Sequence, residues 1–153
     1  GSIPRLAGQR QSVLENKLYR LRAGTMRLPV MDPFARTLAP DEIPEIARYL
    51  SSMPEPTDAL RHGTDEERAR AASLFGQHCA SCHGANGDGN DGLFASRLCG
   101  QYAGYLERRL HEAATRTRGD ADALMQDVVA AVPADDLRLI VVWLSGGKGC
   151  ASP

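Results

Sequence analysis

Several classes of protein are excluded by what this sequence of 153 residues lacks. It has no excess of positive charge, because 18 Lys and Arg residues are balanced by 19 Asp and Glu residues, whereas nucleic-acid-binding domains are usually strongly basic. Its longest apolar run, Leu139 to Leu144, is far shorter than the roughly 18 residues that a membrane-spanning helix needs. Residues 1–4 lack the charged and apolar regions of a signal peptide, which predicts a mature form or a fragment. We therefore expect neither nucleic-acid binding nor a transmembrane segment.

The chain also lacks the strict alternation of apolar and polar residues that marks a β-strand, whereas helical spacing recurs. Thr64 and Glu67 form a predicted capping box, so a helix is expected to begin there and to lead into a cysteine motif. Residues 84–92 are too rich in Gly, Asn and Asp for a helix or strand and predict a loop. Helical spacing resumes over 98–110 and again over 137–144. The sequence predicts an all-α fold.

Two of the four cysteines, Cys79 and Cys82, precede His83 in a C-x-x-C-H motif, which is the attachment signature of c-type haem. Two thiols separated by two residues on one helical turn can each reach one vinyl group of the porphyrin, and the adjacent histidine can then ligate the iron. A thioredoxin-like redox site would need a βαβ context, which the sequence lacks. A structural zinc site would need a second ligand pair, and Cys99 and Cys150 do not have that spacing. The motif therefore predicts one covalently bound haem c in this chain.

The motif and its surroundings resemble a class I cytochrome c, and more specifically the two-domain, dihaem cytochrome c4 type. The resemblance rests on residues 79–89, on residues 97–101, and on a methionine before the last helix. It implies a small helical bundle whose first and last helices cross over the haem, with Phe75 and Trp143 in aromatic contact at the crossing. It also implies that Met125 is the second axial ligand of the haem iron.

Other side chains near the haem have more than one interpretation. Met125 could be an ordinary core residue, and His111 and His78 are weaker candidates for the second ligand. We expect Arg97 to meet the haem propionates. Ser96 stands where the family has a proline whose carbonyl accepts the ring N–H of the proximal histidine. A backbone carbonyl needs no particular side chain, so this hydrogen bond is expected to survive the change to serine.

The chain contains an internal repeat. Residues 5–18 match residues 97–110 at an offset of 92, and after a two-residue shift Met31 falls on Met125 at an offset of 94. Residues 1–53 therefore resemble the C-terminal half of another cytochrome c domain, in which Met31 would be the axial methionine of a second haem.

The repeat predicts a domain order: residues 1–53 form a partial cytochrome c-like domain, 54–63 a Pro-rich linker, and 64–153 a complete haem domain. The first part has no C-x-x-C-H motif, because the offset places that motif upstream of Gly1. The sequence could be a piece of a longer dihaem protein, and only then is a second haem expected. Alternatively, the first part is a haemless unit, or it is completed by another chain.

Thioether attachment of haem takes place on the outer side of the bacterial inner membrane, a compartment that permits disulfides. The sequence therefore predicts a periplasmic protein. Our preferred interpretation of the two remaining cysteines is a disulfide between Cys99 and Cys150, and the alternative is two free thiols.

The resemblance implies electron transport rather than catalysis. A haem iron with both axial positions filled, by His83 and Met125, has no open site for a substrate and can only change oxidation state. We expect the protein to carry single electrons from a quinol-oxidising complex or a dehydrogenase to a terminal oxidase or another acceptor. One alternative is a cytochrome subunit or domain of a larger dehydrogenase or oxidase complex. Another is a haem enzyme with an open iron site, if Met125 is not a ligand.

Overall fold

The computed structural model describes residues 3–54, 63–117 and 123–146. Within these residues every regular element is a helix, and the β-type pairing is one isolated bridge between Asn90 and Ala95. The helices are α1 (Gln11–Arg22), α2 (Asp32–Ala35), α3 (Glu42–Ser52), α4 (Asp65–His78), α5 (Ala80–His83), α6 (Ala103–Ala114), α7 (Ala123–Ala131) and α8 (Ala134–Ser145). The predicted all-α fold is confirmed. None of the described helices combines the length and apolarity needed to cross a bilayer.

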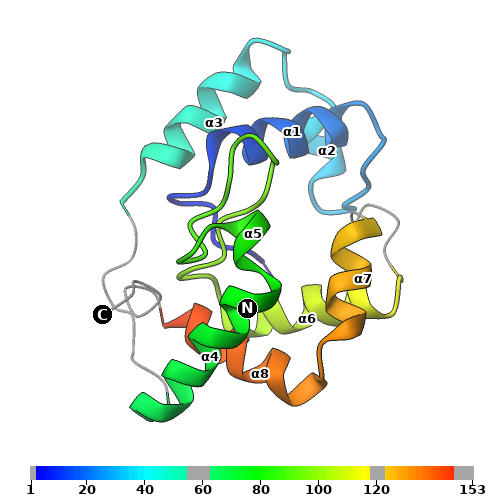
Figure 1. The fold of residues 1–153 in the computed structure, drawn as a ribbon. Coiled ribbons are helices and arrows are strands. Elements are labelled where there is room, and N and C mark those ends of the chain that lie inside the picture. The colour runs from blue at the N-terminus through cyan, green and yellow to red at the C-terminus, as the bar shows by residue number, and fades with distance from the viewer. Residues whose placement is uncertain (1–2, 55–62, 118–122, 147–153) are drawn as a thin grey trace.

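The helices lie in two groups, joined by a long loop (Figure 1). In the upper group α1 packs against α2 and α3, and in the lower group α8 packs against α4 and α6, while α7 packs against α6. The loop between α5 and α6 extends from the lower group to the start of α1, where the Ser12 hydroxyl donates to Asp91 at 2.6 Å. The two groups therefore meet through this loop.

The helix that leads into the cysteine motif begins where the sequence predicts. The Thr64 hydroxyl accepts the N–H of Glu67 at 3.2 Å, and the Glu67 carboxylate accepts the N–H of Thr64 at 2.8 Å. This capping box satisfies two of the backbone N–H groups that have no partner inside the helix. From there α4 runs to His78, directly before the motif.

The core of the second half lies where α4 crosses α8. Phe75 is fully buried and Trp143 is 6% exposed, and their ring centroids are 5.1 Å apart with the planes inclined by 48°. Such a tilted pair adds to the stabilisation that burial of two large aromatic side chains already gives. Ile140 and Leu144 complete the same apolar cluster from α8. The aromatic contact implied by the resemblance is present.

The first half repeats the helix order of α6, α7 and α8. Each bound of α6 lies 92 residues after the matching bound of α1. The N–H of Gly8 donates to the carbonyl of Leu50 at 3.0 Å, and the N–H of Gly100 donates to the carbonyl of Leu144 at 2.7 Å. Both glycines have positive φ, 70° and 77°, which glycine adopts without steric cost. The same turn therefore contacts the last helix in each half.

The two halves differ in how their last helix is covered. At the offset of 94, Tyr49 of α3 corresponds to Trp143 of α8, yet Tyr49 is 66% exposed. Trp143 is buried because α4 lies on it, with Phe75 in contact. Among residues 3–54 no helix corresponding to α4 is described. The same face is thus core in one half and surface in the other.

Two features of the second half were not predicted. Helical spacing begins at Leu98, but α6 begins at Ala103, because the N–H groups of Leu98 and Cys99 both donate to the Gly87 carbonyl, at 2.8 and 3.1 Å, and hold a turn there. In addition, α7 is absent from the predicted elements, although its apolar residues recur at helical spacing. Met125 therefore lies on a helix rather than in a connecting segment.

Part of the predicted domain order lies outside the described residues. α3 ends at Ser52 and α4 begins at Asp65, which agrees with a connection over residues 54–63. Most of this connection, residues 55–62, is outside the described part of the chain. The division into 1–53, 54–63 and 64–153 stays a prediction.

The unequal covering of the two last helices has a measurable consequence. Trp143→Ala is expected to lower the free energy of unfolding by about 3–5 kcal/mol, because it leaves a large cavity against Phe75. The matched change Tyr49→Ala is expected to alter it by no more than about 0.5 kcal/mol, because that ring is largely exposed. Urea unfolding of the haem-loaded chain measures both. Equal losses would contradict the asymmetry.

Candidate functional site

The C-x-x-C-H motif lies on one turn of helix. α4 ends at His78 and α5 ends at His83, with Cys79 between the two helices. The N–H groups of Cys82 and His83 both donate to the Cys79 carbonyl, at 3.2 and 3.0 Å. Both cysteines are half-buried free thiols. The turn therefore presents two thiols and one imidazole together, as covalent haem attachment requires.

Burial also sets the protonation of the first thiol. It raises the pKa of Cys79 to about 11, and the nearby Cys82 adds to the rise. At neutral pH Cys79 is therefore a neutral thiol, which is far less reactive toward disulfides than a thiolate is.

His83 is oriented by a backbone carbonyl. Its Nδ1 lies 2.8 Å from the carbonyl oxygen of Ser96. A carbonyl can only accept, so Nδ1 carries the proton and the lone pair of Nε2 is left for a metal. Burial lowers the pKa of His83 and the charge of Lys17 adds to this, while the bond to Ser96 opposes it. The result is a neutral imidazole. The hydrogen bond that was expected to survive with Ser96 in place of the family's proline is present.

The loop after the motif depends on a glycine. The N–H of Gly89 donates to the His83 carbonyl at 2.7 Å, and φ at Gly89 is +83°. A Cβ atom there would lie 2.7 Å from both the Ala95 carbonyl oxygen and the Arg97 nitrogen, closer than real Cβ atoms approach. The backbone segment that includes Ser96 can therefore lie beside the motif only because residue 89 has no side chain.

The methionine and histidine candidates lie on different elements. Met125 is half-buried on α7, which packs against α6, whereas His111 is exposed and His78 half-buried. In the first half, Met31 precedes α2 and packs on an apolar cluster that includes Met26, which is 5% exposed. Met26 was not among the predicted site residues.

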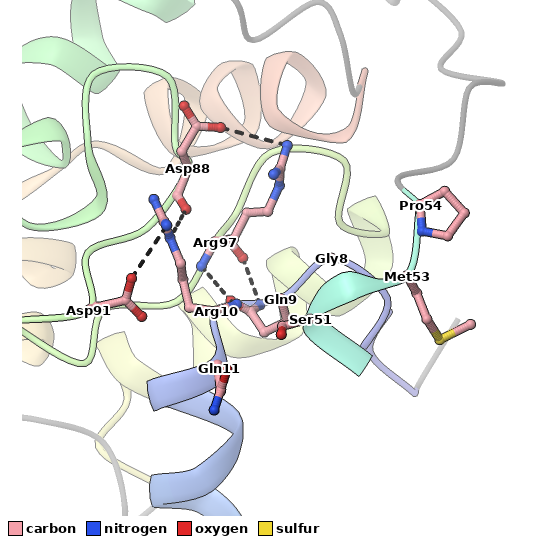
Figure 2. Close-up of a pocket in the computed structure, with 10 residues that line it drawn as sticks. All are labelled: Gly8, Gln9, Arg10, Gln11, Ser51, Met53, Pro54, Asp88, Asp91 and Arg97. Carbon is pink, nitrogen blue, oxygen red and sulfur yellow. Dashed lines mark hydrogen bonds and ion pairs between the residues drawn. The ribbon is translucent and has the colours of Figure 1, made fainter. Parts of the chain in front are cut away.

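Arg97 lies at the junction between the two groups of helices. Its side chain is 19% exposed, Nη2 lies 3.6 Å from the Asp88 carboxylate, and Nε donates to the Cys99 carbonyl at 3.3 Å. Arg10, from the first half, pairs with Asp91 at 3.3 Å and also donates to the Asp88 carbonyl at 2.7 Å (Figure 2). These charged side chains line a polar cavity of about 620 Å³. None of the C-x-x-C-H residues lines this cavity, so it is not the haem site.

Two buried glutamines at this junction were missed by the sequence predictions. Gln9 is 9% exposed and Gln101 is 6% exposed, and each bonds to backbone of the other half. The internal repeat could have pointed to them, because it places a glutamine at the same position in both copies.

Cys99 is buried and disulfide-bonded. Cys150 lies outside the described residues, so the predicted pairing of Cys99 with Cys150 stays a prediction.

The residues of the motif fit haem c. The two thiols are free, they share one helical turn, and the imidazole next to them is neutral with its Nδ1 already bonded. These are the donors that a covalently attached, histidine-ligated haem needs, and the hydrogen bond to Ser96 already fixes the orientation of the imidazole. The turn would hold the haem through Cys79, Cys82 and His83.

The comparisons with known proteins agree with this site. A sequence profile of the family described as "Cytochrome c" matches residues 68–141. A protein of Stutzerimonas stutzeri (strain A1501) named "Thiosulfate dehydrogenase electron acceptor" is 30% identical over 152 residues, which cover 94% of this chain and 70% of that protein.

Two solved structures resemble the fold. One is reduced recombinant cytochrome c4 from Pseudomonas stutzeri, with a TM-score of 0.78 and 25% identity over 95% of this chain and 85% of that chain. The other is thiosulfate dehydrogenase (TsdBA) from Marichromatium purpuratum, with a TM-score of 0.71 and 30% identity. That match covers 94% of this chain but only 32% of the other.

The close approach of the Ala95–Arg97 backbone to Gly89 can be tested by comparing two glycines of the same loop. Gly89→Ala is expected to destabilise the haem-loaded protein by at least about 1–3 kcal/mol, because the new Cβ forces the Ser96–Arg97 segment away and the positive φ becomes strained. Gly92→Ala is the control, since its nearest contact would be 3.4 Å away. Its expected change is within about 0.5 kcal/mol. Urea unfolding would refute the packing argument if both variants behaved alike.

Proposed function

Since the chain belongs to the cytochrome c family, we propose that it carries single electrons between proteins through a haem c whose iron is ligated by His83 and Met125. The observation that carries the ligation is the hydrogen bond from His83 Nδ1 to the Ser96 carbonyl, which fixes the ring and leaves Nε2 for the iron. Met125 is half-buried on a separate helix and is the methionine that precedes the last helix of this domain.

The two axial side chains determine what the site can do. When bound, haem c supplies reversible one-electron chemistry. Ligation by both His83 and Met125 would leave the iron no position for a substrate. A thioether ligand also favours ferrous iron and raises the reduction potential. The protein would hold the cofactor through Cys79 and Cys82 and keep the imidazole of His83 oriented.

Arg97 remains a predicted propionate partner. Its guanidinium already bonds to the Asp88 carboxylate and the Cys99 carbonyl, so a propionate would have to share it with Asp88.

We infer that residues 1–53 are the C-terminal half of a second haem domain, in which Met31 ligates iron when a C-x-x-C-H motif is supplied upstream. The equal spacing of α1 and α6 and the matching turns at Gly8 and Gly100 support this. The Stutzerimonas relative is longer than this chain, which covers 70% of it. A haemless first unit, or completion by another chain, are the alternatives.

We propose the bacterial periplasm as its compartment. Haem attachment to C-x-x-C-H takes place there, and the disulfide at buried Cys99 is stable only where the environment is oxidising.

The most specific partner we propose is a dehydrogenase that oxidises thiosulfate, with a terminal oxidase or another redox protein as acceptor. The support is the resemblance to a protein named as the electron acceptor of thiosulfate dehydrogenase. The second candidate function is a domain of a larger dehydrogenase, because this chain also matches about a third of the TsdBA chain.

Replacement of the proposed sixth ligand tests the ligation. Met125→Ala is expected to abolish the sulfur-to-iron absorption band of the ferric protein and to lower the potential by on the order of 100 mV, because the thioether no longer stabilises ferrous iron. Met53→Ala is the control, since Met53 follows α3 directly and is 36% exposed. A parent-like band in Met125→Ala would reject this ligand.

Pyridine haemochrome assay with intact mass on the same samples gives the haem count. One haem per chain of this length is expected. Two haems on a heavier native chain would assign Met31 to the second iron, and no haem at all would reject the proposed function.

Mixing the oxidised protein with thiosulfate dehydrogenase and thiosulfate tests the donor. Rapid reduction of the haem is expected, followed at its visible absorption bands, while thiosulfate alone leaves the protein oxidised. Elution of the two proteins as one stable complex on gel filtration would favour the domain alternative. Failure of the dehydrogenase to reduce a protein that other donors do reduce would exclude this partner.

A further inference from the structure

The two halves of the chain are joined by a reciprocal exchange of side-chain amides. Oε1 of Gln9 accepts the N–H of Arg97 at 2.7 Å, and its Nε2 donates to the Arg97 carbonyl at 3.0 Å (Figure 2). Oε1 of Gln101 accepts the N–H of Arg5 at 2.8 Å, and its Nε2 donates to the Arg5 carbonyl at 3.0 Å. Each glutamine side chain therefore bonds to both the backbone N–H and the backbone C=O of one arginine in the other half.

One of these bonds falls on the peptide unit that orients the haem ligand. The N–H of Arg97 and the C=O of Ser96 belong to the same peptide group. That carbonyl accepts the Nδ1–H of His83 at 2.8 Å, while the N–H donates to Gln9 at 2.7 Å. A continuous chain of two hydrogen bonds thus links an amide of the first half to the imidazole of the second.

We propose that Gln9 is a positioning residue that tunes the iron ligand His83 across the junction, by polarising the Ser96–Arg97 peptide. This rests on the proposed role of His83 as an iron ligand. A peptide whose N–H is engaged has a more negative carbonyl oxygen, so hydrogen bonds in a chain strengthen one another. A stronger acceptor at Nδ1–H makes the imidazole a better electron donor to the metal. That donation stabilises ferric iron and lowers the reduction potential.

The surrounding hydrogen bonds determine which end of the Gln9 amide faces the N–H of Arg97. If the Gln9 amide were flipped, its NH₂ group would face the N–H of Arg97, and its oxygen would face the Arg97 carbonyl. Oε1 also accepts the N–H of Arg10 at 3.0 Å, which selects the same orientation. Gln9 is 9% exposed and lies beside the polar cavity at the junction.

The equivalent contact of Gln101 with Arg5 supplies a matched control. Gln101 holds the N–H of Arg5, whose peptide partner is the carbonyl of Pro4, the position equivalent to Ser96. Loss of Gln101 removes the same number and kind of bonds from the junction but leaves the Ser96–Arg97 peptide bonded to Gln9. A change in potential or NMR shift that is caused only by weaker contact between the two halves should therefore appear equally in Gln9→Leu and Gln101→Leu.

The experiment compares Gln9→Leu, Gln9→Glu and Gln101→Leu in the full haem-loaded chain. Gln9→Leu is expected to raise the midpoint potential, and NMR should show the Arg97 amide proton moving upfield and the ¹⁵N shift of His83 Nδ1 moving toward that of a weaker hydrogen bond. Gln101→Leu is expected to leave all three near the parent values. Gln9→Glu keeps an acceptor for Arg97, and its potential is expected to be no higher than that of the parent.

Equal shifts in Gln9→Leu and Gln101→Leu, or an unmoved His83 Nδ1 in Gln9→Leu, would overturn the proposal. If Gln9→Leu does not fold, Gln9→Glu decides, because a rise in its potential would also overturn it. The parent spectrum separates this result from the proposed function. A parent without His/Met absorption would reject Met125 as a ligand, whereas the NMR shifts test the relay through His83 whatever occupies the sixth position.

Discussion

The hydrogen bond from His83 to the Ser96 carbonyl is the contact on which the haem site depends. It joins the helical turn that carries the two thiols to a loop thirteen residues further along the chain, at 2.8 Å. It selects the imidazole tautomer and so leaves Nε2 available for the proposed bond to iron. The loop must close tightly for this contact to form, and the missing side chain of Gly89 permits that closure. An electron carrier with a fully ligated iron needs such fixed geometry, because its ligands stay in place through each redox cycle.

The same loop is also where the two halves of the chain meet. From the first half, Arg10 donates to the backbone carbonyls of Asp88 and Gly89, and Gln9 holds Arg97. The segment that orients His83, the proposed iron ligand, is therefore held from both sides, by the second half of the chain and by the preceding repeat. In the proposed function, the first half thereby contributes to the haem site of the second half without having to bind haem itself.

Much of the site could be predicted because it is local in sequence. The C-x-x-C-H motif needs only one helical turn, and the capping box of Thr64 and Glu67 needs only four consecutive residues. The hydrogen bond at Ser96 is not local, and it was predicted from the resemblance to cytochrome c, in which a proline carbonyl accepts it; it survives the change to serine because a backbone carbonyl needs no particular side chain. By contrast, α7 was missed because its apolar run is short and follows a polar segment, so its stability comes from packing on α6 rather than from strong local signals.

The sequence by itself determined the haem motif, the all-α class and the existence of a repeat, because each is encoded in residue identity and spacing. Only the tertiary structure decided which faces of the repeat are core. Tyr49 and Trp143 occupy matching positions, yet one is exposed and the other buried, because burial depends on whether another helix lies on that face. It also decided that Gln9 and Gln101, at matching positions of the repeat, each bond to backbone of the other half. Such contacts join residues about ninety positions apart, and no local pattern encodes the distance between them.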